Sequence, residues 1–148
     1  MIRRAEPEDR PQIMLLIQEF FEEELNGRGY SFSYDQCEQD YDVLEKRDDV
    51  ITLVIDNDGM LDGMICAFVT RRVFFQEVTA TELIWYVRKT VRRDGIKLLR
   101  EFENFCSQAQ CNDITMIGLV DSKAEDMYPR MGYERSEMVF VKKIKKES

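Results

Sequence analysis

The middle of the chain places one acidic residue in an apolar run just before a basic glycine turn. Glu82 is the only acid between Thr81 and Val87, and its neighbours there favour β-strands. Residues 92–97 follow as a turn that opens an amphipathic helix. Backbone N–H groups at a helix start attract anions, and the arginines of this turn add positive charge. The arrangement is suited to holding a pyrophosphate beside a carboxylate.

A carboxylate within such a strand has two interpretations. Glu82 is either a charge at the edge of a sheet or a partly buried group whose pKa is raised. A carboxylate whose pKa is raised toward neutral pH is a useful general base. The chain contains no histidine, so general acid and base work must fall to Glu, Asp, Tyr, Lys or Cys.

Tyr128 is a second candidate for proton transfer. A tyrosine phenol ionises in a range comparable to that of an alkyl thiol, so it can protonate a leaving thiolate. The alternative is core packing, because Met127, Met131 and Tyr133 surround Tyr128 at helical spacing.

The chain resembles the GNAT superfamily of acetyl-CoA-dependent N-acetyltransferases from Ile2 to about Ile144. The segment from Ile2 to Asp9 resembles the first strand and helix entry of that family. The segment from Tyr128 to Tyr133 resembles its final motif, which carries a tyrosine.

The central motif of the family matches in part. The family pattern asks for Gln or Arg, two residues, Gly, one residue, then Gly or Ala. Arg92 and Gly95 match it, and Lys97 stands where the last small residue belongs. If Gly95 instead fills the last slot, Thr90 and Arg93 occupy the other two positions, so the register stays open.

The resemblance implies an enzyme that moves the acetyl group of acetyl-CoA to a primary amine of a small molecule or peptide. It implies Glu82 as a base acting through water and Tyr128 as the acid that protonates the CoA thiolate. The strand backbone and the helix start would bind acetyl-CoA, through Trp85, Tyr86, Val87, Arg92, Arg93, Asp94, Gly95, Ile96 and Lys97.

The acceptor side is expected to be acidic and aromatic. Acidic residues surround the predicted two-helix segment, and by resemblance this segment and the connection with Phe74 and Phe75 border the acceptor cleft. A cationic amine is therefore favoured over an acidic peptide. Two alternatives stay open: the acids are solvated helix faces, or Phe74 and Phe75 form a homodimer contact. The predicted substrate-binding residues are Tyr30, Phe32, Phe74 and Phe75.

A second function belongs to a different class. Lys97 departs from the family pattern, and Lys89 stands where the family usually has proline. These departures favour a degenerate member that acts as a non-catalytic acyl-CoA-binding or protein-interaction module. Retention of both Glu82 and Tyr128 favours the enzyme.

Composition limits the class of protein. A chain of 148 residues with 44% hydrophobic residues predicts one domain over residues 1–148, with a basic tail at 143–148. The net charge of -8 argues against a nucleic-acid partner. We expect a cytoplasmic protein without a membrane partner or a metal site, because apolar runs are short and the four cysteines lack paired spacing.

The predicted elements describe an α+β domain with a central, mostly antiparallel twisted sheet flanked by helices. A helix follows Pro7, and the Asp58-Gly59 step predicts a hairpin turn. Further helices are predicted at 34–46, 93–110 and 123–131, and strands at 50–55, 64–69, 79–87, 114–120 and 137–144.

Overall fold

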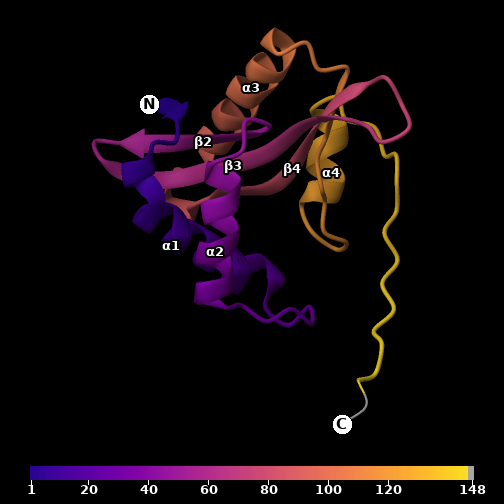
Figure 1. The fold of residues 1–148 in the computed structure, drawn as a ribbon, viewed down its shortest axis with the longest axis horizontal. Coiled ribbons are helices and arrows are strands. Elements are labelled where there is room, and N and C mark those ends of the chain that lie inside the picture. Colours follow the sequence, from indigo (N-terminus) through magenta and orange to yellow (C-terminus); the bar gives the residue numbers. More distant parts are fainter. Residues whose placement is uncertain (147–148) are drawn as a thin grey trace. The chain divides into compact units, whose positions relative to one another are not determined.

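The computed structural model describes residues 1–146, so the last two residues of the predicted basic tail lie outside the described residues. The chain divides into two compact units, one of residues 1–116 and one that begins at residue 117. The first unit holds a five-stranded sheet in the order β1-β2-β3-β4-β5 (Figure 1). Neighbouring strands are antiparallel except β4 and β5, which are parallel. The predicted α+β class and mostly antiparallel sheet are confirmed.

The long strands form where the sequence predicts them. The two-residue turn between β2 and β3 has positive φ at Asp58 (53°) and Gly59 (93°). Both central residues of a type I′ hairpin turn need positive φ, which explains the Asp-Gly step. The strands are β1 (Ile2–Arg4), β2 (Val50–Asn57), β3 (Met60–Arg71), β4 (Val78–Val87) and β5 (Asp113–Thr115).

The helices also begin near their predicted positions. Ser33 starts α2, because its side-chain oxygen accepts a hydrogen bond from the Gln36 N–H at 3.3 Å. Other helix types flank the first predicted helix: a 3-10 turn, η1 (Pro7–Asp9), precedes it and a π-helical turn, η2 (Phe21–Leu25), follows it. The α-helices are α1 (Arg10–Phe20), α2 (Tyr34–Glu45), α3 (Arg93–Gln108) and α4 (Ala124–Arg130).

Helices cover both faces of the sheet in the first unit. Figure 1 shows α1 and α2 on one face and α3 on the other. Ile13 and Leu16 of α1 pack with Met64 and Ile84 of the sheet in one buried cluster. On the opposite side, α3 buries a stripe of its own at Leu98, Leu99, Phe102 and Cys106. A sheet buried on both faces holds its strands, and any side chain on them, in fixed positions.

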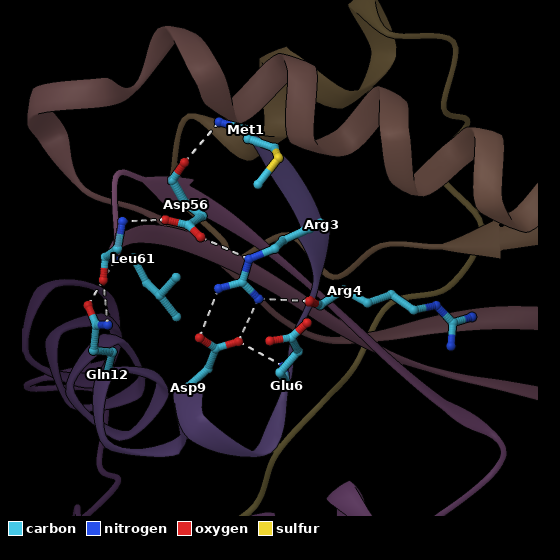
Figure 2. A network of polar contacts seen from close by, with 9 residues as sticks. Met1, Arg3, Arg4, Glu6, Asp9, Gln12, Asp56 and Leu61 are labelled. Carbon is cyan, nitrogen blue, oxygen red and sulfur yellow. Dashed lines mark hydrogen bonds and ion pairs between the residues drawn. The ribbon is translucent and has the colours of Figure 1, made fainter.

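A polar network joins β1 to the first helical turn and to the β2–β3 hairpin (Figure 2). The Arg3 guanidinium donates to both carboxylate oxygens of Asp9, at 2.8 and 3.0 Å, and to Asp56 at 2.9 Å. The hydrogen bonds from Arg3 lower the pKa of the buried Asp9 carboxyl. Gln12 of α1 meanwhile donates to the Gly59 carbonyl at 2.9 Å. We call Arg3, Asp9 and Asp56 the Arg3 cluster.

Two predicted strands are not formed as predicted. The strand expected at 114–120 is limited to β5, Asp113–Thr115. The strand expected at 137–144 is wrong, because the described backbone there is irregular and the side chains from Met138 to Val141 are 71–86% exposed. β-Favouring residues make a strand only when another strand offers a ladder and a packing face.

The second unit contains α4, and Gly132, two residues after the end of this helix, has a φ of 90°. Glycine is favoured there because side chains with a Cβ rarely adopt left-handed backbone. Within the described part of the chain, the helices all fall short of the length and apolar character that crossing a bilayer requires.

Candidate functional site

Strand β4 carries a β-bulge at Leu83. Cys66 of β3 pairs with Ile84, whereas the next residue, Ala67, pairs with Glu82, so Leu83 is one extra residue. Leu83 is 40% exposed, whereas the preceding residue, Glu82, is only 6% exposed. The bulge therefore separates a surface leucine from a buried carboxylate.

The bulge also decides which face of the sheet receives Glu82. Under strict alternation Glu82 would share the face of Ile84, which packs against α1. The observed pairing instead gives Glu82 the face of Ala67, which is also the face of Trp85. A Cβ on Gly95 of α3 would lie 3.8 Å from the Trp85 ring, so this face is the one that α3 covers.

The pairing of β4 with β5 ends beside this bulge. The parallel ladder runs from Thr79 to Thr81 on β4 and ends at Thr115 on β5. β4 itself continues to Val87, paired along β3. A strand edge beyond the end of a ladder is where an extended ligand can add its own amide hydrogen bonds.

The first turn of α3 follows directly from the end of β4. A 3-10 turn, η3 (Lys89–Val91), leads into Arg92, and no side chain caps the helix that begins at Arg93. The first N–H groups of an α-helix have no partner within the helix, and its dipole favours an anion there. The Gly95 N–H turns back to the Arg92 carbonyl at 3.0 Å.

The first turn of α3 carries more positive than negative charge. Asp94 lies 3.4 Å from Lys97, which offsets the charge of that lysine. Arg92 and Arg93 are exposed, and within residues 1–146 neither forms a salt bridge. Two guanidinium groups thus stay available beside an uncapped helix start. Both groups can donate several hydrogen bonds to phosphate oxygens.

Gly95 has a packing role in the structure. A Cβ at this position would lie 3.4 Å from Cγ2 of Val87, at the short limit of ordinary contact. The glycine therefore lets the first turn of α3 approach the end of β4 closely.

The side chain of Tyr86 points to the other face, toward α1. Its hydroxyl donates to Glu23 at 2.8 Å and to Glu19 at 3.3 Å, and burial together with these carboxylates raises its pKa. Arg88, the residue that follows β4, donates to Glu19 at 2.9 and 3.0 Å and contacts Asp62. Its charge is thus already compensated. The spacing of four between Glu19 and Glu23 was the only sequence signal for this cluster.

The predicted acceptor residues lie on two loops. Phe32 packs against Phe21 as a tilted ring pair with centroids 5.5 Å apart, and Tyr30 is exposed two residues earlier. Phe74 and Phe75 lie between β3 and β4, with Phe74 94% exposed and at a φ of 73°. A large side chain held in left-handed backbone and in solvent is unusual.

Tyr128 belongs to the second unit and lies on α4. Its ring centroid is 5.4 Å from that of Tyr133, and its carbonyl accepts the Tyr133 N–H at 3.0 Å. A Cβ on Gly118 would lie 3.7 Å from the Tyr128 ring. These contacts orient the ring through its apolar body, which a phenylalanine would share.

Comparison with known proteins finds similarity at the level of the fold. No family model and no curated protein matches the chain. A solved apo aminoglycoside 6'-N-acetyltransferase of Acinetobacter haemolyticus is 20% identical, with a TM-score of 0.74 over 98% of this chain and 99% of that one.

Two further solved structures agree with this. A GNAT family acetyltransferase of Staphylococcus aureus is 17% identical, with a TM-score of 0.73 over 97% of this chain and 98% of that one. A mutant form of a Bacillus halodurans protein is 15% identical, with a TM-score of 0.83 over 97% and 99% of the two chains. The chain therefore has the fold of the GNAT acetyltransferases.

Proposed function

We propose that this protein is an acetyl-CoA-dependent N-acetyltransferase that transfers the acetyl group to a primary amine. The observation that carries the proposal is the bulge at Leu83, because it brings the buried Glu82 to the face of the sheet where α3 begins. The acetyltransferase names of solved proteins with the same fold support this reaction class.

The start of α3 fits the pyrophosphate of CoA. Its first turn is uncapped, and Arg92 and Arg93 add exposed positive charge. The edge of β4 after the bulge fits the amides of the pantetheine arm, in the manner of an added strand. We assign Trp85, Tyr86 and Val87 to this arm through their backbone, since the Tyr86 side chain is engaged elsewhere. When bound, acetyl-CoA supplies the acetyl group as an activated thioester.

Glu82 acts as the general base in this proposal. An amine is nucleophilic only after its ammonium proton is lost, and a carboxylate can accept that proton through one water. The buried position of Glu82 limits its exchange with bulk water and keeps its carboxylate in one place. The carboxylate is therefore already positioned when the amine binds.

Tyr128 acts as the general acid. Its hydroxyl donates a proton to the departing CoA sulfur, which then leaves as a thiol. The ring contact with Tyr133 orients the phenol. Tyr128→Phe keeps the ring that contacts Tyr133 and removes the oxygen that would donate the proton.

The acceptor is a cationic amine in this proposal. Glu22, Glu23 and Glu24 share the π-helical turn η2, close in sequence to the exposed Tyr30 and to Phe32. Grouped carboxylates raise the local concentration of cations, an effect that salt screens.

Thiol release from acetyl-CoA tests the reaction and its acid together. Wild-type protein should release thiol only when an amine is present. Tyr128→Phe should lower turnover by about 10²-fold or more with acetyl-CoA affinity unchanged. The matched control is Tyr133→Phe, which keeps the ring pair and should leave turnover unchanged. Loss of folding in Tyr128→Phe with normal turnover per folded molecule would instead show a packing role.

A panel of polyamines, aminoglycosides, basic peptides and acidic peptides tests the acceptor. Glu22→Gln should raise the KM for a polyamine by about two- to fivefold at low salt and have no effect at high salt. Glu8→Gln, an exposed acid in η1, is the control. Preference for acidic acceptors, or rates that ignore salt, would remove the electrostatic assignment.

A further inference from the structure

The C-terminal end of α3 is a Schellman motif that begins and ends with a cysteine. Gln110, just after the helix, has left-handed backbone with a φ of 60°. Its N–H donates to the Ser107 carbonyl at 3.0 Å, and the Cys111 N–H donates to the Cys106 carbonyl at 2.9 Å. These are the two hydrogen bonds that define the motif, and they turn the chain back over the last turn of the helix.

The motif brings the two cysteine side chains together. In a Schellman motif the residue after the left-handed position commonly contacts the side chain at the start of the turn. Here burial and the neighbouring Cys111 thiol raise the pKa of Cys106 to about 12, and a side-chain hydrogen bond between the two thiols contributes. Because that bond favours the protonated form of Cys106, its S–H is the donor and the Cys111 sulfur is the acceptor.

Both cysteines are held by the fold of the first unit. Cys106 lies on the buried stripe of α3 and is 2% exposed. Cys111 is followed by Asn112, whose N–H donates to the Val78 carbonyl at 2.8 Å and whose side-chain oxygen accepts the Val78 N–H at 2.9 Å. A disulfide requires two cysteines with close Cβ atoms, and two thiols that already contact each other need little backbone movement to form one.

We propose that Cys106 and Cys111 form a reversible disulfide when the protein meets hydrogen peroxide, so that the end of α3 is a site of redox modification. Peroxide reaches Cys111 first, because Cys106 is buried. The Cys111 thiolate attacks one peroxide oxygen, the O–O bond breaks, and the other oxygen leaves as water after taking up the thiol proton. Cys111 is then a sulfenic acid.

The buried thiol completes the reaction. The Cys106 sulfur attacks the Cys111 sulfur, the S–O bond breaks, and the hydroxyl leaves with the Cys106 proton as a second water. Two thiols have then lost two electrons in total, and one hydrogen peroxide has become two waters. Thiol–disulfide exchange with a small dithiol reverses the modification.

The other two cysteines have different partners. The Cys37 thiol donates to the Met14 sulfur at 3.8 Å, and the Cys66 sulfur accepts from the Thr52 hydroxyl at 3.3 Å. The hydrogen-bond partner of each is therefore not a second thiol. Oxidation of Cys37 should stop at oxygen addition, which makes this residue an internal control.

Peptide mass spectrometry of the folded full chain, without acetyl-CoA, tests the proposal. The protein is treated with hydrogen peroxide, remaining thiols are blocked with N-ethylmaleimide, and trypsin then releases both cysteines in one peptide of residues 101–123. That peptide should carry no maleimide and should lose two hydrogens, about 2 Da. Dithiothreitol before blocking should restore two maleimide sites, and Cys111→Ser should abolish the loss of mass.

Two substitutions at Gln110 test whether the motif directs the reaction. Gln110→Val places a β-branched residue in left-handed backbone, so it should open the motif and lower the disulfide yield by about threefold or more. Gln110→Gly is the matched control and should keep the wild-type yield, because glycine adopts this conformation readily. Circular dichroism establishes that both variants remain folded.

Three results would overturn the proposal. In the first, Met116 of the same peptide gains oxygen while both thiols remain free. In the second, the disulfide joins Cys111 of two chains, which a gel without reductant detects. In the third, Gln110→Val and Gln110→Gly give equal yields while folded. If Gln110→Val does not fold, the wild-type and Cys111→Ser peptides decide the question.

Discussion

The Arg3 cluster and the start of α3 both place arginines beside carboxylates in the first unit, yet they differ in how the charges are matched. In the Arg3 cluster, one guanidinium meets two carboxylates at 2.8–3.0 Å. At the start of α3, one carboxylate, Asp94, stands near Arg92, Arg93 and Lys97 in the sequence, and among residues 1–146 its one salt bridge is with the lysine.

This difference distinguishes charges that stabilise the fold from charges that remain available to a ligand. Four of the five N–H donors of the Arg3 guanidinium are used within the fold, so the Arg3 cluster stabilises the contact between β1, η1 and the hairpin. Excess positive charge beside uncapped helix N–H groups does nothing for the fold and is suited to an anion. Arg88 is also structural in this sense, because Glu19 and Asp62 engage it.

The largest loss of turnover should come from Glu82→Gln. Turnover should fall by about 10²- to 10⁴-fold, because the variant cannot accept the ammonium proton. The deficit should shrink at high pH, where free amine is already abundant. Steady-state kinetics against pH provide the measurement, with Glu101→Gln on the exposed side of α3 as the control. Wild-type turnover in Glu82→Gln would leave the carboxylate a structural role only.

The Arg3 cluster should respond in the opposite way. Asp9→Asn should lower the free energy of unfolding by about 1.5–3 kcal/mol at neutral pH while turnover per folded molecule stays normal. Asp42→Asn, at a half-exposed carboxylate that pairs with Arg10 and Lys46, should have a much smaller effect. Urea denaturation checks both, and reduced turnover in folded Asp9→Asn would contradict the structural assignment.

The pH dependence of the same variant has a defined sign. The folded-state pKa of Asp9 is lowered by Arg3, so its contribution to stability is present above the unfolded pKa and lost as pH falls through the folded value. The difference between wild type and Asp9→Asn should therefore disappear in acid. A difference that persists there would assign the effect to shape rather than charge.

Gly95 distinguishes packing from ligand approach. Gly95→Val should destabilise the protein by about 1–3 kcal/mol, because its methyl groups meet Val87 and Trp85. Gly95→Ala places only a Cβ at 3.4 Å and should fold normally with nearly unchanged acetyl-CoA affinity. Thermal denaturation and calorimetry check the pair. A large affinity loss in folded Gly95→Ala would show that the glycine faces the ligand.

The smallest effects concern single charges at the start of α3. Arg92→Ala should weaken acetyl-CoA binding by about two- to fivefold at low salt, and Asp94→Asn should strengthen it by a similar factor. Both changes should fade as salt rises. Titrations at two salt concentrations measure them, and equal affinities in the two variants would contradict a phosphate site at this turn.

Local sequence signals were sufficient for most of the fold. The Asp58-Gly59 turn, the Ser33 cap and the apolar stripe of α3 depend on neighbouring residues, so their elements lie where predicted. The bulge at Leu83 could not be predicted, since it depends on pairing with β3. Arg88 and Glu19 are 69 residues apart in the sequence, so local sequence patterns could not predict their contact. The strand predicted at 137–144 failed for the same reason, because a ladder needs a partner.

The most direct test of the central claim is calorimetric titration of the full chain with acetyl-CoA. We predict saturable binding of one acetyl-CoA per chain that weakens as salt rises and that Arg92→Ala reduces. Measurement at about 15 and about 30 °C guards against a temperature at which the heat vanishes, because apolar burial gives binding a heat-capacity change. Absence of saturable heat at both temperatures, or binding that neither salt nor Arg92→Ala weakens, would contradict an acyl-CoA site at the start of α3.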